Sequence, residues 1–274
     1  MGTGTSRRSF LTAASSAAIA GAFVGRPAGG QGLEKGEGPR VSATFPSQSP
    51  SLVREVVAVS HANIDRVREL VTEFPELAKA AQDWGFGDWE SALGAASHMG
   101  RRDIAELLIE RGARPDLFTF AMLGQLEVVK AFIRASPGIQ RMQGPHGFSL
   151  LHHARVGGKE AEPVARYLEE LGDADPSYTD LPLTDEAKAV YVGEYAVGAA
   201  GGDRLQVLLD RRGSLAIQRG DYFPRTLFHQ GRHEFHPTGA SSVRLRFSVE
   251  KGKAKALEIT GSTPRIEALR VAAA

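Results

Sequence analysis

The sequence predicts an α + β protein in separate domains: a helical solenoid at residues 51–178, then a small antiparallel β-sheet or open β-barrel at 183–274. Three observations predict this fold class. Apolar residues recur at helical spacing up to about residue 178, apolar and polar residues alternate after Leu183, and the net charge changes from negative to positive near the same place. Two segments with different periodicity and opposite charge indicate two folding units.

The composition excludes several classes of function. With 42% hydrophobic and 24% charged residues, the 274-residue chain has the make-up of an ordinary globular protein. It contains no cysteine, which excludes disulfides, thiol catalysis and cysteine-bound metals. The net charge of +1 lacks the basic surplus that nucleic-acid binding usually needs, so we expect no nucleic-acid partner.

The first 30 residues have the features of a targeting segment. A pair of arginines precedes Phe and Leu, and a run without charge follows until Arg26. This pattern resembles a bacterial twin-arginine export signal, and the residues that carry it are Arg7, Arg8, Phe10 and Leu11. The uncharged run Phe10–Gly25 is shorter than the about 20 apolar residues of a membrane span, so we expect no stable span. The resemblance implies a periplasmic or extracellular protein that the twin-arginine machinery exports.

Residues 31–50 are expected to be a flexible linker. They mix Gly, Pro, Ser and Gln with few large apolar side chains. Such a segment buries too little surface to offset the entropy lost on ordering.

Residues 51–178 contain internal repeats. The positions Asn63, Gly100, Gly124 and Gly158 recur at spacings of 37, 24 and 34 residues. The strongest units, 91–116 and 147–176, resemble ankyrin repeats, which implies about four degenerate helix pairs stacked on a shared core. We expect the four recurring positions to hold tight or left-handed backbone between helices, and Ser91 and Ser149 to cap helices. The resemblance also implies that loop tips and inner helices bind another protein.

The segment after Leu183 alternates in the manner of half-buried strands. Leu205, Val207 and Leu209 share one face of a predicted strand, and further alternating runs follow at 215–217, 243–249 and 257–259. The stretch Val190–Tyr195 resembles the start of a small β-domain appended to secreted serine-hydrolase-like proteins. In those proteins the domain is an accessory module, so the resemblance implies no chemistry by itself.

The insertion at residues 83–89 contains both tryptophans of the chain and is a candidate contact surface for a partner protein, because aromatic residues dominate interface hot spots. An alternative is that the tryptophans seal a weak first repeat. The turn at 144–148 is a second candidate contact, and the alternative is that its residues only form a turn. His152 is expected to have a structural role. The predicted partner-binding residues are Trp84, Phe86, Trp89, His146, Phe148 and His153.

A search for catalytic and metal-binding motifs identifies no active site in the sequence. The chain has no Gly-x-Ser-x-Gly, His-Glu-x-x-His or phosphate-loop motif. His229, His233 and His236 could in principle bind zinc with Glu234, but on a strand His233 and His236 point to opposite faces. We therefore expect no catalytic residues, no metal and no cofactor.

These observations favour an exported, non-enzymatic adaptor or scaffold that binds another protein. One alternative is an envelope hydrolase or metal-dependent enzyme that uses the C-terminal β-domain. A second is a structural envelope protein in which neither part binds a diffusible ligand.

Overall fold

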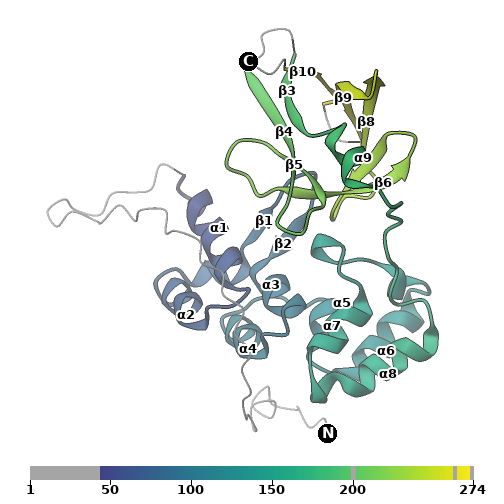
Figure 1. Ribbon diagram of the computed structural model, residues 1–274. Helices are drawn as coiled ribbons and strands as arrows, with labels where there is room; N and C mark the ends of the chain where they lie inside the picture. Colours follow the sequence, from purple (N-terminus) through teal and green to yellow (C-terminus); the bar gives the residue numbers. More distant parts are fainter. Residues whose placement is uncertain (1–43, 199–201, 262–263, 272–274) are drawn as a thin grey trace, which may run out of the picture. The chain divides into compact units, whose positions relative to one another are not determined.

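The helical and the strand segments of the chain follow one another in a computed structural model that describes residues 44–198, 202–261 and 264–271 (Figure 1). Contacts group residues 42–274 into one compact unit. The predicted export signal at 1–30 and the linker up to residue 43 lie outside the described residues. Among the helices that are described, none has the length and apolar character needed to cross a membrane.

The helical segment carries eight α-helices, four 3-10 helices and one β-hairpin in the described residues. The α-helices are α1 (Pro50–Val59), α2 (Ile64–Glu73), α3 (Ala92–His98), α4 (Arg102–Glu110), α5 (Leu117–Met122), α6 (Leu126–Ala135), α7 (Leu150–Val156) and α8 (Glu162–Leu171). The 3-10 helices are η2 (Pro75–Lys79), η3 (Ile139–Arg141), η4 (Pro145–Gly147) and η5 (Lys159–Ala161). The hairpin consists of β1 (Ala81–Asp83) and β2 (Trp89–Ser91), which pair antiparallel.

Side chains at the helix starts explain where several helices begin. The hydroxyl of Ser91 accepts a hydrogen bond of 2.9 Å from the backbone N of Gly94, and Ser149 does the same for His152 at 3.0 Å. Both confirm the predicted caps. Asn63 accepts from the backbone N of Arg66 at 3.0 Å and so caps α2.

The predicted inter-helix glycines have left-handed backbone, with φ of 67° at Gly100, 76° at Gly124 and 72° at Gly158. A Cβ at Gly100 would lie 2.2 Å from the carbonyl oxygen of Val156, so this position also allows close approach of two chain segments. The prediction is wrong for Asn63, whose φ is −111°. Its capping role explains why a side-chain oxygen is needed there.

The predicted ankyrin solenoid is wrong. A closed β-barrel forms a substantial part of the fold, and the helical segment is not one continuous repeat array. Its buried side chains form two separate apolar clusters, one around Leu70, Ile104 and Leu108 and the other around Leu150 and Leu168. The described residues between α1 and α8 contain a single hairpin, and 3-10 helices interrupt the spacing. The short sequence units resembled repeats because helix pairs share apolar spacing, whatever array they belong to.

The C-terminal segment opens with the short helix α9 (Asp185–Ala189) and continues with eight strands. The strands are β3 (Gly193–Val197), β4 (Asp203–Leu209), β5 (Leu215–Gln218), β6 (Arg225–Gly231), β7 (Glu234–Pro237), β8 (Arg244–Glu250), β9 (Lys253–Thr260) and β10 (Ile266–Arg270). Each strand pairs antiparallel with its neighbour in sequence, and β10 pairs with β3. The sheet is therefore a closed barrel.

Alternation along the strands fills the barrel interior. Leu205 and Val207 of β4 are buried, and Phe235 and Tyr195 are the largest fully buried side chains inside. The predicted small sheet or open barrel is wrong, because the barrel closes where Leu269 of β10 lies opposite Ala196 of β3. That pairing joins segments about 70 residues apart and involves one buried side chain of β10, so local alternation could not indicate it.

Candidate metal centre

The β1–β2 hairpin places two acidic side chains in the interior. The turn has positive φ at all of residues 85–87, and β2 follows it at once. Burial alternates along β2, so Glu90 is 1% exposed although the neighbouring Trp89 is 62% exposed. Asp88, directly before β2, is 3% exposed. Buried carboxylates need partners, because an unpaired buried charge is very unfavourable.

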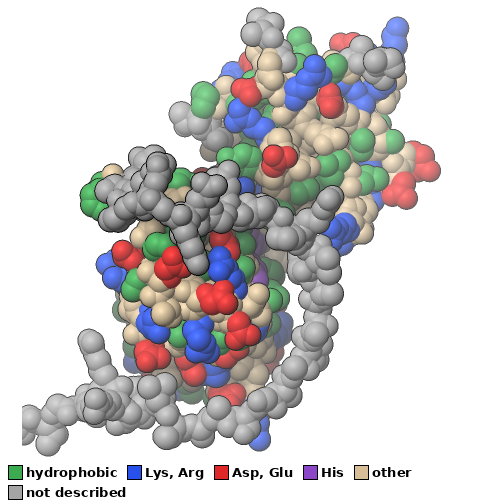
Figure 2. Space-filling model, turned by 90° about the vertical axis from the view of Figure 1, so that its left-hand side faces the viewer, with side chains coloured by type: hydrophobic (Ala, Val, Ile, Leu, Met, Phe, Trp, Pro, Cys, Tyr) green, Lys and Arg blue, Asp and Glu red, His purple; other side chains and the backbone are tan. Residues whose placement is uncertain are grey.

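Three histidines from separate segments surround Glu90. His61 follows the end of α1, His98 is the last residue of α3, and His146 lies in η4 with a left-handed φ of 59°. The side chains of His61 and His146 keep 27% and 20% of their surface exposed, whereas that of His98 keeps 3%. On the face shown in Figure 2, acidic and basic side chains are intermixed and a small area of histidine surface is visible.

One carboxylate oxygen is the centre of this cluster. Oε1 of Glu90 accepts a hydrogen bond of 2.7 Å from Nε2 of His98 and lies 3.3 Å from Nε2 of His146 and 3.6 Å from Nε2 of His61. One ligand atom from each of the four side chains lies within 4.8 Å of all the others. We call these four residues the histidine–glutamate cluster. Among the described residues, this is the group of histidine and acidic side chains whose ligand atoms lie close enough together to hold a metal ion.

Outer hydrogen bonds orient three of the four side chains. Nδ1 of His61 lies 3.0 Å from the carbonyl oxygen of Ala58, Nδ1 of His146 lies 2.7 Å from Oδ2 of Asp88, and Nε1 of Trp84 donates to Oε2 of Glu90 at 2.7 Å. A ring that donates from Nδ1 turns its Nε2 toward the centre of the cluster. The fourth ring, His98, has no partner for its buried Nδ1 in the described residues.

The barrel contributes one charged residue beside the cluster. Arg225, the first residue of β6, donates a hydrogen bond from Nη2 to Oδ2 of Asp88. Asp88 also accepts from the backbone N of His146 at 2.9 Å. The carboxylate of Asp88 therefore links the barrel to the ring of His146.

The electrostatics match these contacts. Burial would lower the pKa of His146, but hydrogen bonds to Asp88 and Glu90 outweigh it and raise that pKa to about 9. Burial would raise the pKa of Glu90, but hydrogen bonds from His146 and His98 hold it well below its usual range. Burial lowers the pKa of His61, which favours its neutral form. At neutral pH the cluster thus holds the ionised carboxylate of Glu90, the neutral imidazole of His61 and the imidazolium of His146, which must lose its Nε2 proton to bind a metal.

A stack of rings supports the cluster from the α7 side. The ring of Phe148 lies between those of His98 and His152, with centroid distances of 4.7 Å and 4.3 Å. Nε2 of His152 lies 2.9 Å from the carbonyl oxygen of His98, which is the structural role expected for His152. His153 is fully buried, its Nδ1 lies 2.8 Å from the hydroxyl of Ser97, and burial lowers its pKa to about 3.

The six predicted partner-binding residues lie in different environments. Trp89 is strongly exposed, whereas Trp84 is 7% exposed and the hairpin-tip residue Phe86 packs against the barrel core. His146 belongs to the histidine–glutamate cluster, Phe148 stacks beside it, and His153 is buried. Binding of a partner protein stays a prediction, for which the exposed Trp89 is the best-placed residue.

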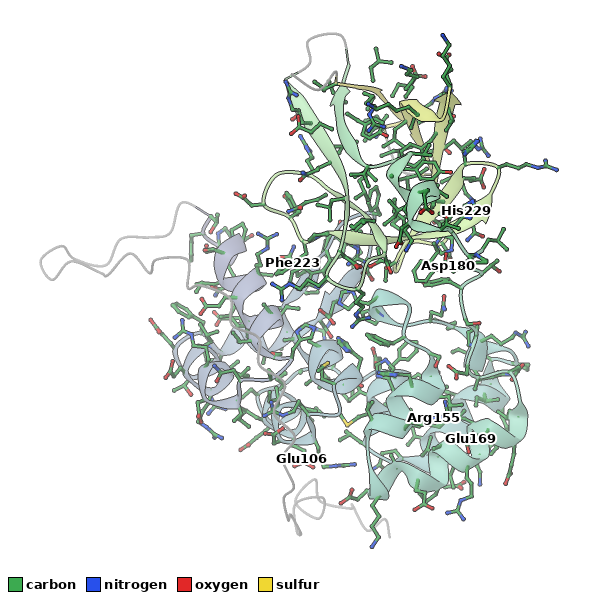
Figure 3. The ribbon with its side chains drawn as sticks, viewed as in Figure 1. Glu106, Arg155, Glu169, Asp180, Phe223 and His229 are labelled. Carbon is green, nitrogen blue, oxygen red and sulfur yellow. The ribbon has the colours of Figure 1, made fainter. Side chains whose placement is uncertain are left out.

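The histidines of the barrel do not join this cluster. His236 is buried and stacks on Phe228, and Nδ1 of the exposed His233 lies 2.8 Å from the hydroxyl of Tyr191. His229 and Asp180 line a cavity of about 230 Å³ at one place on the barrel, where the backbone N of His229 donates to Asp180 (Figure 3). The barrel histidines thus have separate local partners.

Three members of the cluster were absent from the sequence expectations: His61, Glu90 and His98. One available signal is the alternation at 89–91, which buries Glu90 if Trp89 is exposed. A second is His98, a polar residue that ends the otherwise small and apolar stretch Ala92–Ser97. No local signal joins these positions to His61 and His146, because the four come from segments far apart in sequence.

No protein-family model matches the chain, and no curated protein matches it. Among solved structures, the chain is similar to one titled "Crystal structure of SurE with D-Leu", at 26% identity and a TM-score of 0.25, and to one titled "Crystal structure of SurE", at 24% and 0.26. These matches cover 42% and 43% of this chain, and the chain spans 27% of the length of each of those structures. Likeness this low carries no argument about fold or function.

Proposed function

We propose that this protein binds one divalent first-row transition-metal ion through His61, Glu90, His98 and His146. The observation that carries the proposal is the convergence of one ligand atom from each residue within 4.8 Å of all the others. Three imidazoles and a carboxylate suit zinc and its neighbours in the first row, whereas calcium and magnesium prefer sites made of oxygen.

The distances suit such an ion after a small adjustment. Around a tetrahedral ion with bonds of about 2.0–2.1 Å, neighbouring ligand atoms are about 3.4 Å apart. Oε1 of Glu90 already lies 3.3 Å and 3.6 Å from two of the histidine nitrogens. The hydrogen bond of 2.7 Å to His98 must lengthen, because Nε2 gives up its proton when it binds a metal.

The outer hydrogen bonds fit the pattern of a metal site. A metal-binding histidine usually donates its other ring N–H to a carboxylate or a backbone carbonyl. His146 is placed in this way on Asp88, and His61 on the carbonyl of Ala58. With Nδ1 held in this way, Nε2 of His146 and of His61 is directed toward Oε1 of Glu90, at 3.3 Å and 3.6 Å.

Catalysis at the bound metal is a second candidate function, and one observation favours it. Glu90 and His98 are buried, but the side chains of His61 and His146 are 27% and 20% exposed, so one side of the cluster is accessible. Catalytic zinc sites keep a position for water, which in a site with four protein ligands has to be a fifth position on this accessible side. The exposed Phe223 contacts the ring of Trp84 with a centroid distance of 5.7 Å.

Zinc binding by the full chain tests the proposal. Protein stripped with a chelator is titrated with Zn²⁺ at pH 8, and bound metal is counted by mass spectrometry. We expect one ion per chain, with a loss in Glu90→Gln and His98→Asn larger than the roughly 10–100-fold cost of outer-shell changes. His233→Ala, in an exposed barrel turn, is the matched control and should bind as the wild type does. Unchanged zinc binding in both cluster variants would overturn the proposal.

Hydrolysis of chromogenic ester and phosphoester substrates tests the catalytic candidate. Activity that needs the added metal and disappears in His98→Asn would support it. Stoichiometric metal binding without any metal-dependent hydrolysis would leave metal binding as the function and remove hydrolysis of these substrates.

A further inference from the structure

Arg225 is a buried charge from the barrel that ends beside a residue of the helical segment. It is 8% exposed, and its Nη2 donates both to Oδ2 of Asp88 and, at 2.5 Å, to the carbonyl oxygen of Thr238. One nitrogen of the guanidinium thus bridges the β1–β2 hairpin and the barrel. Its Nη1 lies 3.4 Å from Nδ1 of His146, the nitrogen that faces away from the histidine–glutamate cluster.

The carboxylate of Asp88 is fixed by hydrogen bonds and by a close contact with the barrel. Its two oxygens accept from the backbone N of His146 at 2.9 Å, from Nδ1 of the same residue at 2.7 Å, and from Arg225. Gly239 of the barrel packs closely against the Asp88 side chain, since a Cβ at Gly239 would lie 2.4 Å from the carboxyl carbon of Asp88. The carboxylate can therefore shift little, and neither can the ring that donates to it.

We infer that Arg225 is a positioning residue of the metal site, which fixes the ring of His146 through Asp88. The inference rests on the proposed metal binding and deepens it: the four ligands belong to the helical segment, but the barrel sets the orientation of one of them. Arg225 touches the outer nitrogen side of His146 and not Nε2, so it acts through Asp88 and is not itself a ligand.

Arginine suits this role better than lysine. Nη2 of the guanidinium directs its two N–H groups within one rigid plane, which allows it to hold the Asp88 carboxylate and the Thr238 carbonyl together. The ammonium of a lysine would supply the charge without that planar fork. We therefore expect Arg225→Lys to restore part of what Arg225→Met removes.

Cobalt substitution of the full chain tests the inference, because the visible absorption of Co²⁺ reports its coordination geometry. In Arg225→Met we expect Zn²⁺ affinity to fall about 10–100-fold, and the Co²⁺ spectrum to change as His146 loses its fixed orientation. Arg225→Lys should lie between this variant and the wild type. Arg219→Met is the control: Arg219 is an exposed barrel residue paired with Asp203, and both readouts should stay as in the wild type.

A double-mutant cycle with Asp88→Asn shows whether both residues act along one route. If Arg225 acts through Asp88, the loss in affinity of Arg225→Met with Asp88→Asn will be clearly smaller than the sum of the single losses. A role confined to stability would lower the melting temperature and leave the Co²⁺ spectrum of the folded protein unchanged. If Arg225→Met fails to fold, Arg225→Lys and Asp88→Asn carry the same test.

Two results would overturn the inference, and they are distinguishable. Wild-type spectrum and affinity in Arg225→Met and Arg225→Lys, together with metal loss in His98→Asn, would remove the role of Arg225 and leave the metal site. Absence of metal binding in the wild-type chain would remove both proposals.

Discussion

Nε1 of Trp84 donates a hydrogen bond of 2.7 Å to Oε2 of Glu90, and the other oxygen of the same carboxylate faces three histidines. By binding Oε2, the indole orients the Glu90 carboxylate so that Oε1 faces the three histidines of the histidine–glutamate cluster. Both partners are almost fully buried, so water cannot replace this bond when it is lost. A tryptophan predicted as a possible contact with a partner protein thus lies beside the cluster.

Trp84→Phe should weaken zinc binding about 10-fold, because a smaller aromatic ring remains but the N–H that orients Glu90 is lost. It should also lower the free energy of unfolding by about 1–3 kcal/mol, the usual cost of an unsatisfied buried acceptor. Zinc titration and urea unfolding of the two proteins measure these effects. Trp89→Phe, at the exposed tryptophan of the same hairpin, is the control and should change neither. Equal zinc affinity in Trp84→Phe and the wild type would show that the indole does not orient the carboxylate.

The stability of the metal-free protein should fall between about pH 6.5 and pH 9. The pKa of His146 rises from 6.5 to about 9 on folding, because its charged form is bound by Asp88 and Glu90. A raised pKa gives stability that is fully present below the unfolded value and is lost as the pH rises through the folded value. The change is on the order of 2 kcal/mol, measured by urea unfolding in the presence of a chelator.

His146→Gln is the matched variant for this pH dependence, since its side chain does not titrate. Its stability should be flatter over the same range, and the two curves should approach each other near pH 9. A wild-type curve without any decline from pH 6.5 to 9 would contradict the charged state of His146.

The sequence predicts local features of this fold well and its closure poorly. Ser91 and Ser149 could be recognised as caps, and Gly100, Gly124 and Gly158 as left-handed positions, because each depends on a few neighbouring residues. The solenoid and the open barrel were wrong because both depend on which elements meet over long separations, such as β10 with β3.

The cluster was beyond sequence reasoning for the same reason. His61 follows α1, His98 ends α3 and His146 interrupts η4, and nothing in their spacing indicates a common centre. His146 was singled out as part of an exposed turn, although its ring lies between two buried carboxylates. The expectation of a metal-free protein followed from local motif searches, which find ligands close together in sequence.

Gly100→Ala should destabilise the protein more than Gly158→Ala. Both glycines have positive φ, where a residue with a Cβ is strained by about 1–3 kcal/mol. At Gly100 the new Cβ would in addition lie 2.2 Å from the carbonyl oxygen of Val156, whereas nothing lies within 4 Å at Gly158. Thermal unfolding should show a loss of about 1–3 kcal/mol for Gly158→Ala and a clearly larger loss for Gly100→Ala. Similar losses in the two variants would mean that the contact with Val156 relaxes at no cost.

Phe86→Ala and Trp89→Ala should separate packing from partner binding within one hairpin. Phe86 packs against the barrel core, so its truncation should lower the free energy of unfolding by about 2 kcal/mol. Trp89 is 62% exposed, and its loss should leave thermal unfolding unchanged. If the predicted partner protein uses this hairpin, Trp89→Ala should reduce its capture in a pull-down, because exposed tryptophans are the usual anchors. Equal capture by Trp89→Ala and the wild type would place any partner contact elsewhere on the chain.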